Sequence, residues 1–233
     1  GASAADTRGA AYDAGLRSYM LSVYNYMASG VLLTGIVALL FASGGRDSLA
    51  AQVFMAPGIL KYVVIFSPLA FIMVLNFGLN RLSTGAAQMI FWAFAAVMGV
   101  SMSTIFLVYT GTSIAVTFFA TAVAFLSLSL YGYTTKRDLS GMGTFLIMGV
   151  VGLIVASLLN LFFKSPAMAM VISAVGVLLF AGLTAYDTQR IKSMYAYVAG
   201  TDMIGKAVIM GALSLYLDFI NMFQFLLSFM GQR

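Results

Sequence analysis

The chain has 233 residues, of which 62% are hydrophobic and 8% charged, and its net charge is +5. A soluble domain carries about 25% charged residues, so this composition excludes an ordinary water-soluble fold. Cysteine and histidine are both absent. Their absence excludes disulfides, thiolate metal sites and a Ser-His-Asp triad, and it leaves carboxylates as the groups that would respond to pH near neutrality.

The chain begins with a polar segment, which is followed by long apolar stretches. Residues 1–20 carry Arg8 and Arg17 and contain no short apolar core before a cleavage site, so we expect a polar, partly disordered tail rather than a signal peptide. Each apolar stretch is long enough to cross a ~30 Å hydrocarbon core as a helix. The seven stretches lie near 21–42, 60–79, 86–109, 113–132, 142–163, 167–188 and 207–229.

These stretches indicate an all-α protein. The ~10-residue segments of alternating polarity that are typical of a membrane β-barrel are not found. Connections are short except at 43–59 and 189–206, which leaves no room for a domain outside the membrane. The sequence predicts one bundle of seven transmembrane helices over residues 21–233, embedded in a lipid bilayer.

Lysine and arginine in the connections predict the orientation of this bundle. If the N-terminus is cytoplasmic, the inner segments hold eight basic residues and the outer segments hold four. Inner loops are enriched in Lys and Arg, so we expect the N-terminus inside and the C-terminus outside. The positive net charge is then explained by topology and by attraction to the inner leaflet, and no nucleic-acid partner is expected.

Asp218 is the most unusual residue, because it lies near the centre of the seventh span. A charged Asp in that position costs about 2.5–3.5 kcal/mol on insertion scales, and such residues usually have a function. Gly211, Ser214, Asp218 and Asn221 follow helical spacing and form one stripe of small and polar side chains. We expect this stripe to face the bundle interior or a watery cavity, with Ser214 and Asn221 as candidate pore-lining residues.

Asp187, near the inner end of the sixth span, is the second candidate. It could simply pair with Arg190, one turn further on. Consecutive antiparallel spans usually pack side by side, so Asp187 and Asp218 are expected to meet. Two close carboxylates in a low dielectric can share a proton, titrate as a pair, or bind a hard cation such as calcium through their oxygens.

The estimated depths of the two aspartates conflict. Asp218 lies about 18 Å from Lys206 along its helix, whereas Asp187 lies about 5 Å from Arg190, at 1.5 Å rise per residue. The pair can form only if the sixth helix continues past Arg190 with its basic side chains snorkelling, or if the bundle opens inward. Besides Arg190, a candidate counter-charge is Arg81 at the end of the second span, although a positive-inside anchor also explains that residue.

Two other classes of seven-helix protein fit the sequence less well. A retinal photoreceptor needs a lysine in the middle of the last helix, whereas Lys206 lies at its start. An intramembrane aspartyl protease also uses one Asp from each of two neighbouring helices. Its second motif is Gly-x-Gly-Asp, however, where this chain has Leu-Tyr-Leu-Asp at 215–218, and no proline follows Pro166. We therefore expect no enzymatic activity and no catalytic residues.

The segments "GLTAYDTQRIKSMY" (182–195) and "SLYLDFINMFQFLLSFMG" (214–231) resemble the BAX inhibitor-1 (transmembrane BAX inhibitor motif) family. The resemblance covers the chain from about residue 20. It implies a seven-helix bundle with the last helix enclosed, and a pH-sensitive calcium leak. It also implies that Asp187 and Asp218 form the pH-sensing pair, and that an arginine of the second span, here Arg81, belongs to the closed state.

From the residues and the resemblance together we expect a passive calcium leak channel in a bacterial inner membrane. Its ligands would be calcium ions, which Asp187 and Asp218 would bind, and protons, and no cofactor is expected. Passive flux follows from the lack of a Walker-type Gly-x-x-x-x-Gly-Lys motif. A membrane interaction protein whose aspartates only join helices remains the main alternative, and an intramembrane aspartyl protease and a proton-coupled transporter are the less favoured ones.

Overall fold

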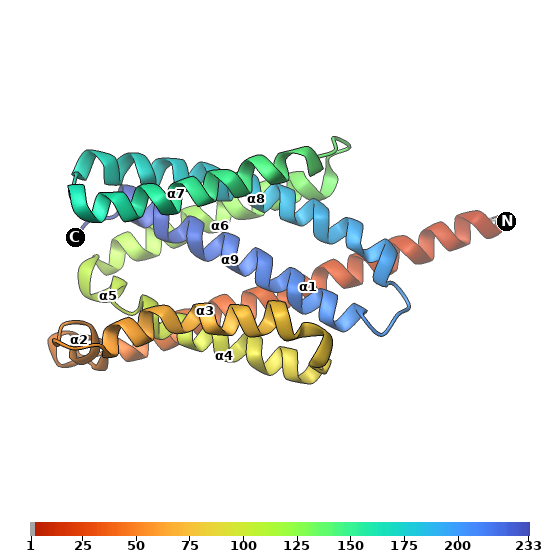
Figure 1. The fold of residues 1–233 in the computed structure, drawn as a ribbon. Coiled ribbons are helices and arrows are strands. Elements are labelled where there is room, and N and C mark those ends of the chain that lie inside the picture. The colour runs from red at the N-terminus through yellow and green to blue at the C-terminus, as the bar shows by residue number, and fades with distance from the viewer. Residues whose placement is uncertain (1–2) are drawn as a thin grey trace.

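The computed structural model describes residues 3–233, and within that range the chain forms helices and connections without strands (Figure 1). The elements in chain order are α1 (Ala4–Phe41), η1 (Gly45–Asp47), α2 (Leu49–Phe54), α3 (Leu60–Gly78), η2 (Leu79–Arg81), α4 (Thr84–Met102), α5 (Ile105–Val108), α6 (Gly111–Thr134), η3 (Ser140–Met142), α7 (Gly143–Phe163), α8 (Pro166–Val198) and α9 (Ile204–Met230).

Seven of these helical segments are long and apolar enough to cross a membrane, if α4 and α5 are taken together as one span over Thr84–Val108. The predicted all-α membrane bundle is confirmed. Each predicted span coincides with one of the seven, although α1 and α8 extend well beyond their predicted ends.

The last helix is enclosed by the others, as the resemblance implied. In the 18-residue apolar stretch of α9, 67% of the residues are buried. In the corresponding stretches of the other six spans, the buried share is 11–33%. The helices α1, α4, α6 and α8 all pack against α9, while α3 lies outside α4, and α7 lies outside α8 (Figure 1). Any group buried at the centre of α9 is therefore shielded from lipid by protein.

The expected disorder of residues 1–20 is wrong for the described part of that segment, because α1 begins at Ala4. Ser3 and Asp6 form a reciprocal capping box that satisfies free backbone N–H groups at the start of the helix. Further along α1, the rings of Tyr12 and Tyr19 pack against Tyr195 of α8, with centroids 5.1 and 5.3 Å away. These contacts hold the polar part of α1 against the end of α8.

Small residues allow two pairs of helices to approach closely. A Cβ added to Gly132 of α6 would lie 2.2 Å from the carbonyl oxygen of Ala185 in α8. A Cβ added to Gly99 of α4 would lie 2.6 Å from the carbonyl oxygen of Thr34 in α1. Such small-residue contacts are how helices associate in lipid, where the hydrophobic effect does not drive them together.

The N-terminus and the predicted inner connections lie at one end of the bundle, and the C-terminus lies at the other (Figure 1). At the first end, the connection between α6 and α7 is ordered by hydrogen bonds. Gln189 of α8 accepts from the backbone N–H of Leu139 and donates to the carbonyl oxygen of Arg137. The backbone N–H of Ser140 donates to Oδ1 of Asp138 at 3.0 Å and lowers the pKa of that carboxyl below its ordinary value.

This hydrogen bond predicts a small acid sensitivity. Because the pKa of Asp138 is lower in the folded state, its stabilising contribution is present above the ordinary pKa and is lost as the pH falls through the folded value. We expect Asp138→Asn to reduce the fall in melting temperature on acidification below about pH 4. Thermal unfolding of the wild type and the variant across acidic pH measures this, and identical acid sensitivity would contradict it.

Candidate functional site

The polar stripe of α9 faces α8. Gly211 contacts Ile191 of α8, where an added Cβ would lie 3.2 Å from the Ile191 side chain. One turn on, Ser214 accepts a hydrogen bond from Arg190 of α8. Asp218 comes another turn later and is 4% exposed. The stripe therefore lies along the interface between the two helices that carry the predicted acid pair.

Asp187 and Asp218 are neighbours on the packed helices α8 and α9, and α8 continues as a helix to Val198. Asp187 is 7% exposed and Asp218 is 4% exposed, so both carboxyl groups are buried where α8 packs on α9. Of the two conditions stated for the pair, the structure has the continued helix, since α8 extends past Arg190 to Val198. Lys192 donates to the carbonyl oxygen of Tyr133 at 2.7 Å, which satisfies its amine within the long helix.

Asp218 is incompletely satisfied. Its Oδ2 atom is buried and has no hydrogen-bond partner among the residues that the structure describes. A buried polar atom without a partner costs about 1–3 kcal/mol, and more if it is charged. The oxygen is therefore suited to carry a proton or to contact a cation.

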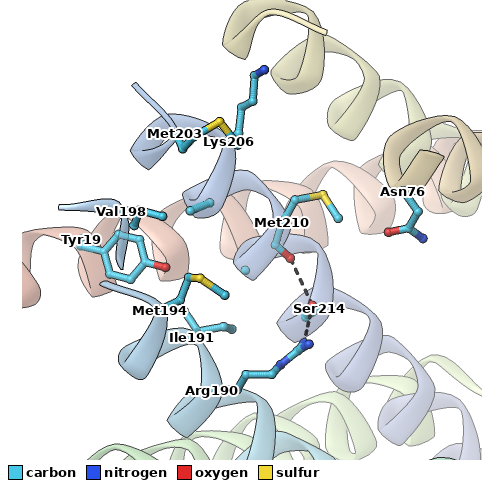
Figure 2. A pocket seen from close by; sticks show the side chains of 12 residues that line it. Tyr19, Asn76, Arg190, Ile191, Met194, Val198, Met203, Lys206, Met210 and Ser214 are labelled. Atoms are coloured by element: carbon cyan, nitrogen blue, oxygen red, sulfur yellow. Dashed lines mark hydrogen bonds between the residues drawn. The ribbon is translucent and has the colours of Figure 1, made fainter. Parts of the chain in front are cut away.

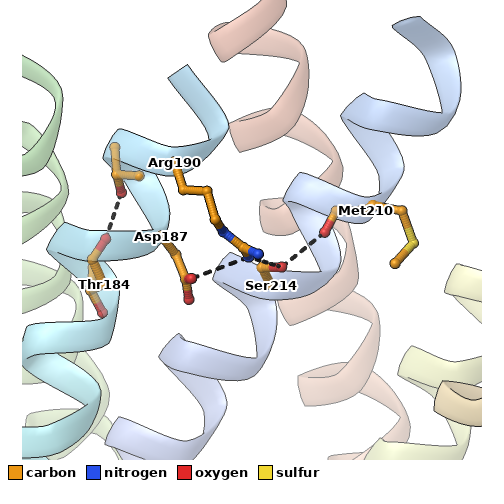
Figure 3. Close-up of polar contacts among 6 residues, drawn as sticks. Thr184, Asp187, Arg190, Met210 and Ser214 are labelled. Carbon is orange, nitrogen blue, oxygen red and sulfur yellow. Dashed lines mark hydrogen bonds and ion pairs between the residues drawn. The ribbon is translucent and has the colours of Figure 1, made fainter. Parts of the chain in front are cut away.

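Arg190 is the counter-charge of the pair. Its Nη2 atom lies 3.3 Å from Oδ1 of Asp187 and 3.4 Å from Oγ of Ser214, so it bridges α8 and α9 (Figure 3). Arg190 also acts on Asp218 through its charge. Thr184, one turn before Asp187, is buried, but its hydroxyl donates to the carbonyl oxygen of Phe180 and its carbonyl oxygen accepts from the hydroxyl of Thr188, both within α8.

Arg81, the other arginine predicted for this role, is not at the site. It ends the 3₁₀ turn η2, is exposed, and makes no ion pair with the residues described. Its role in a closed state stays a prediction. Proximity in sequence to Asp187 indicated Arg190 correctly, because i and i+3 lie on one face of a helix.

A cavity of about 400 Å³ lies on the N-terminal side of the pair (Figure 2). It extends between α1, α3, α8 and the first half of α9, and Arg190 and Ser214 are part of its lining. Neither aspartate lines it. Arg190 therefore lies between this cavity and the two carboxyl groups.

A second cavity, of about 390 Å³, lies beyond Asp218 toward the C-terminal end of α9. Asn221 is its polar lining residue on α9, and Phe225 and Phe180 lie beside it. The rings of Phe180 and Phe225 stack with centroids 5.9 Å apart, and Phe225 packs on Gly176. Of the two candidate pore-lining residues, Ser214 thus lines one cavity and Asn221 the other, with Asp218 between them.

Two further polar residues of α9, Gln224 and Ser228, were not predicted; they line a cavity of about 290 Å³ next to the second one. Both continue the helical spacing of the stripe from Asn221 toward the C-terminus. Extending the stripe by about two more turns would have found them.

The site does not form a closed metal cage. No group of three or more Asp, Glu, His or Cys side chains that could hold a metal ion occurs among residues 3–233. Calcium takes six to eight oxygen ligands. Two carboxylates with neighbouring hydroxyl, amide and water oxygens would therefore form a weak binding site that the ion occupies briefly, and not a tight one. Binding of calcium by Asp187 and Asp218 stays a prediction.

The fold and the site define a polytopic helical membrane protein whose enclosed last helix holds a buried carboxyl pair with the helix before it. The sequence profile of the family described as "Inhibitor of apoptosis-promoting Bax1" matches residues 16–233, and the chain belongs to this family.

Bacterial relatives match over almost the whole chain. It is 47% identical to an uncharacterized protein of Rickettsia prowazekii over 95% of this chain and 92% of that protein. It is 46% identical to an uncharacterized protein of Caulobacter vibrioides over 97% and 93%. It is 43% identical to the inner membrane protein YbhL of Escherichia coli over 94% of each. The resemblance found in the sequence is confirmed, and the protein is an integral membrane protein.

Proposed function

We propose that the protein is a passive, pH-sensitive calcium leak channel of a bacterial inner membrane, gated by the Asp187–Asp218 pair. The observation that supports this most is the buried carboxyl pair on the central helix, with Oδ2 of Asp218 lacking a partner. The inner-membrane location follows the name of the Escherichia coli relative, and the cytoplasmic N-terminus follows the eight basic residues at that end of the bundle.

Charge balance gives this pair two states. Asp187 and Arg190 compensate each other, so a protonated Asp218 leaves the site neutral. Loss of that proton leaves one uncompensated negative charge in a low-dielectric interior, where it is unfavourable without a cation. In the first state the shared proton holds α8 and α9 together. In the second, repulsion loosens the pair and both carboxylates become available to calcium.

The cavities on either side of the pair support a path through it. Ser214 lines the cavity toward the N-terminal end, and Asn221 lines the cavity toward the other end. Oxygen ligands then occur at successive turns of α9, as a hard cation moving along the helix would need. The stacked rings of Phe180 and Phe225 are the apolar barrier that such a path would have to open.

Purified protein in liposomes with a trapped calcium dye tests this function. We expect calcium flux above that of empty liposomes, and we expect the initial rate to change between about pH 6 and pH 8 as the pair gains or loses its proton. Asp202→Asn, which alters an aspartate in the connection between α8 and α9, is the matched control and should behave as wild type. Flux no greater than that of empty liposomes at any pH would overturn the proposal.

A further inference from the structure

The cavity on the N-terminal side of the acid pair is positively charged, whereas the entrance to a cation path is expected to be negative or neutral. Its charged lining residues are Arg190 and Lys206, and no carboxylate lines it. Lys206 makes no ion pair with any residue that the structure describes. Much of the remaining wall is apolar, with three methionines among the lining residues. A calcium ion that enters from this side meets positive charge before it meets the aspartates.

Arg190 lines this cavity at the end that is nearest to Asp187 (Figure 2). It follows Asp187 by three residues on α8 and so lies about one helical turn nearer the cavity. Its Nη2 atom contacts Asp187 and Ser214, which belong to the two helices that a cation would have to pass between (Figure 3). The guanidinium thus already occupies a place where a cation could contact Asp187 and Ser214.

The guanidinium is held loosely. Both of its contacts, at 3.3 and 3.4 Å, are longer than the 2.7–2.9 Å of a strong charge-assisted hydrogen bond. The Arg190 side chain is 53% exposed, whereas that of Asp187 is 9% exposed. An ion pair with one exposed partner is weak, because water competes for the charge. A divalent cation with the same oxygens available could therefore displace it.

An aromatic ring and several titratable groups surround Arg190. Its guanidinium carbon lies 5.9 Å from the ring centre of Tyr186, within the range of a cation–π contact. Other titratable groups facing it are Asp218 and Lys206 of α9 and Tyr19 of α1. From α3 the lining contributes the neutral Asn76. Asp187 and Asp218 are therefore the acids that Arg190 and an incoming cation would share.

We propose that Arg190 is a tethered cation that closes the approach to the acid pair, and that a divalent cation must displace it from Asp187 and Ser214. The inference rests on the proposed function, since it assigns to Arg190 the role of an internal competitor of the permeating ion. Arg190 is then a residue that sets the calcium concentration at which the site fills, and it does so through its charge and not through the fold.

Calcium binding measured without flux tests this role. Full-length protein in detergent is titrated with calcium by calorimetry at neutral pH. We expect Arg190→Gln to lower the apparent dissociation constant about three- to tenfold, because the lost competitor was a weak ion pair facing a divalent ion. Arg190→Lys keeps the charge and should stay nearer the wild-type value. Arg17→Gln, which removes an exposed arginine at the same end of the bundle, should leave the constant unchanged.

The same variants in liposomes should show the same order of half-saturating calcium concentrations. Arg190→Met removes the same charge but leaves the Ser214 oxygen in place, and it should shift binding in the direction of Arg190→Gln, so it provides the test if Arg190→Gln does not fold. Equal dissociation constants for wild type and both variants, or no calcium binding by any of them, would overturn the role of Arg190. Absence of flux from wild-type liposomes would instead overturn the proposed function, and the titration would still test Arg190.

Discussion

Replacing Asp218 with asparagine is expected to remove the pH dependence of calcium flux through the reconstituted protein. Asparagine has nearly the same shape but no proton to lose, so the one carboxyl left at the site is that of Asp187, which is paired with Arg190. The ratio of initial rates at pH 6 and pH 8 should fall to about 1, because the pair can no longer titrate. Dye-loaded liposomes measure it, with rates normalised to the amount of protein incorporated.

Folding and general acid effects have to be separated from this result. Asp218 is 4% exposed and its Oδ2 lacks a partner, so an amide in its place removes no hydrogen bond that the structure shows. The variant should therefore remain a single species on size exclusion. Asp138→Asn changes an exposed acid outside the spans and should keep the wild-type pH profile. A wild-type profile in Asp218→Asn would refute gating by this residue.

The largest effect on stability is expected from Gly132→Ala. The added Cβ would lie 2.2 Å from the carbonyl oxygen of Ala185, which belongs to the backbone of α8 and cannot rotate away. The two helices must then separate or shift. Overpacking of this kind costs about 1–3 kcal/mol. Thermal unfolding in detergent should show a clear fall in melting temperature, and because Ala185 is two residues from Asp187, flux should change as well.

Gly152→Ala in α7 is the matched control. An added Cβ there has no other atom within 4 Å, so the substitution leaves packing unchanged and replaces a poor helix former with a good one. Its melting temperature should equal or slightly exceed that of the wild type. Equal melting temperatures for the two variants would mean that α6 and α8 do not approach as closely as the structure has them.

Apolar length and the polar stripe of the last span were enough to predict the bundle and the inward-facing side of that span, whereas the enclosure of the last helix was implied by the family resemblance. In lipid, a helix satisfies its own backbone groups, so about twenty apolar residues nearly determine a span. Gly211, Ser214, Asp218 and Asn221 line up at helical spacing among bulky apolar residues, and such a face must turn away from lipid. Both the apolar length and the helical spacing can be seen within one segment of the sequence. The structure has the seven spans, and Gly211 and Ser214 of the stripe contact α8.

The ends of α1 and α8 could not be predicted from hydropathy. Residues 4–20 and 189–198 are polar, and hydropathy alone does not distinguish a polar helix from a loop. Both are helical here, and the rings of Tyr12, Tyr19 and Tyr195 join them. Contacts between residues far apart in the sequence therefore hold the polar ends of α1 and α8 together, and hydropathy carries no signal for such contacts.

The choice between Arg81 and Arg190 illustrates the same limit. Both arginines were within reach of the inner ends of the spans on sequence grounds. The structure has Arg190 3.3 Å from Asp187, whereas Arg81 is exposed at the end of η2. A residue's role can be transferred from a family only where the alignment of its helix is certain. Arg81 follows α3, which packs mainly on α4 at the edge of the bundle and away from the acid pair.

The central claim is that the Asp187–Asp218 pair controls calcium passage. The most direct measurement compares calcium flux of wild type and Asp187→Asn/Asp218→Asn in the same liposomes at about pH 6 and pH 8, with equal protein incorporation. If the pair titrates as a unit, the wild-type rate differs between the two pH values and the double variant shows one rate at both. A double variant that keeps the wild-type difference would contradict the account.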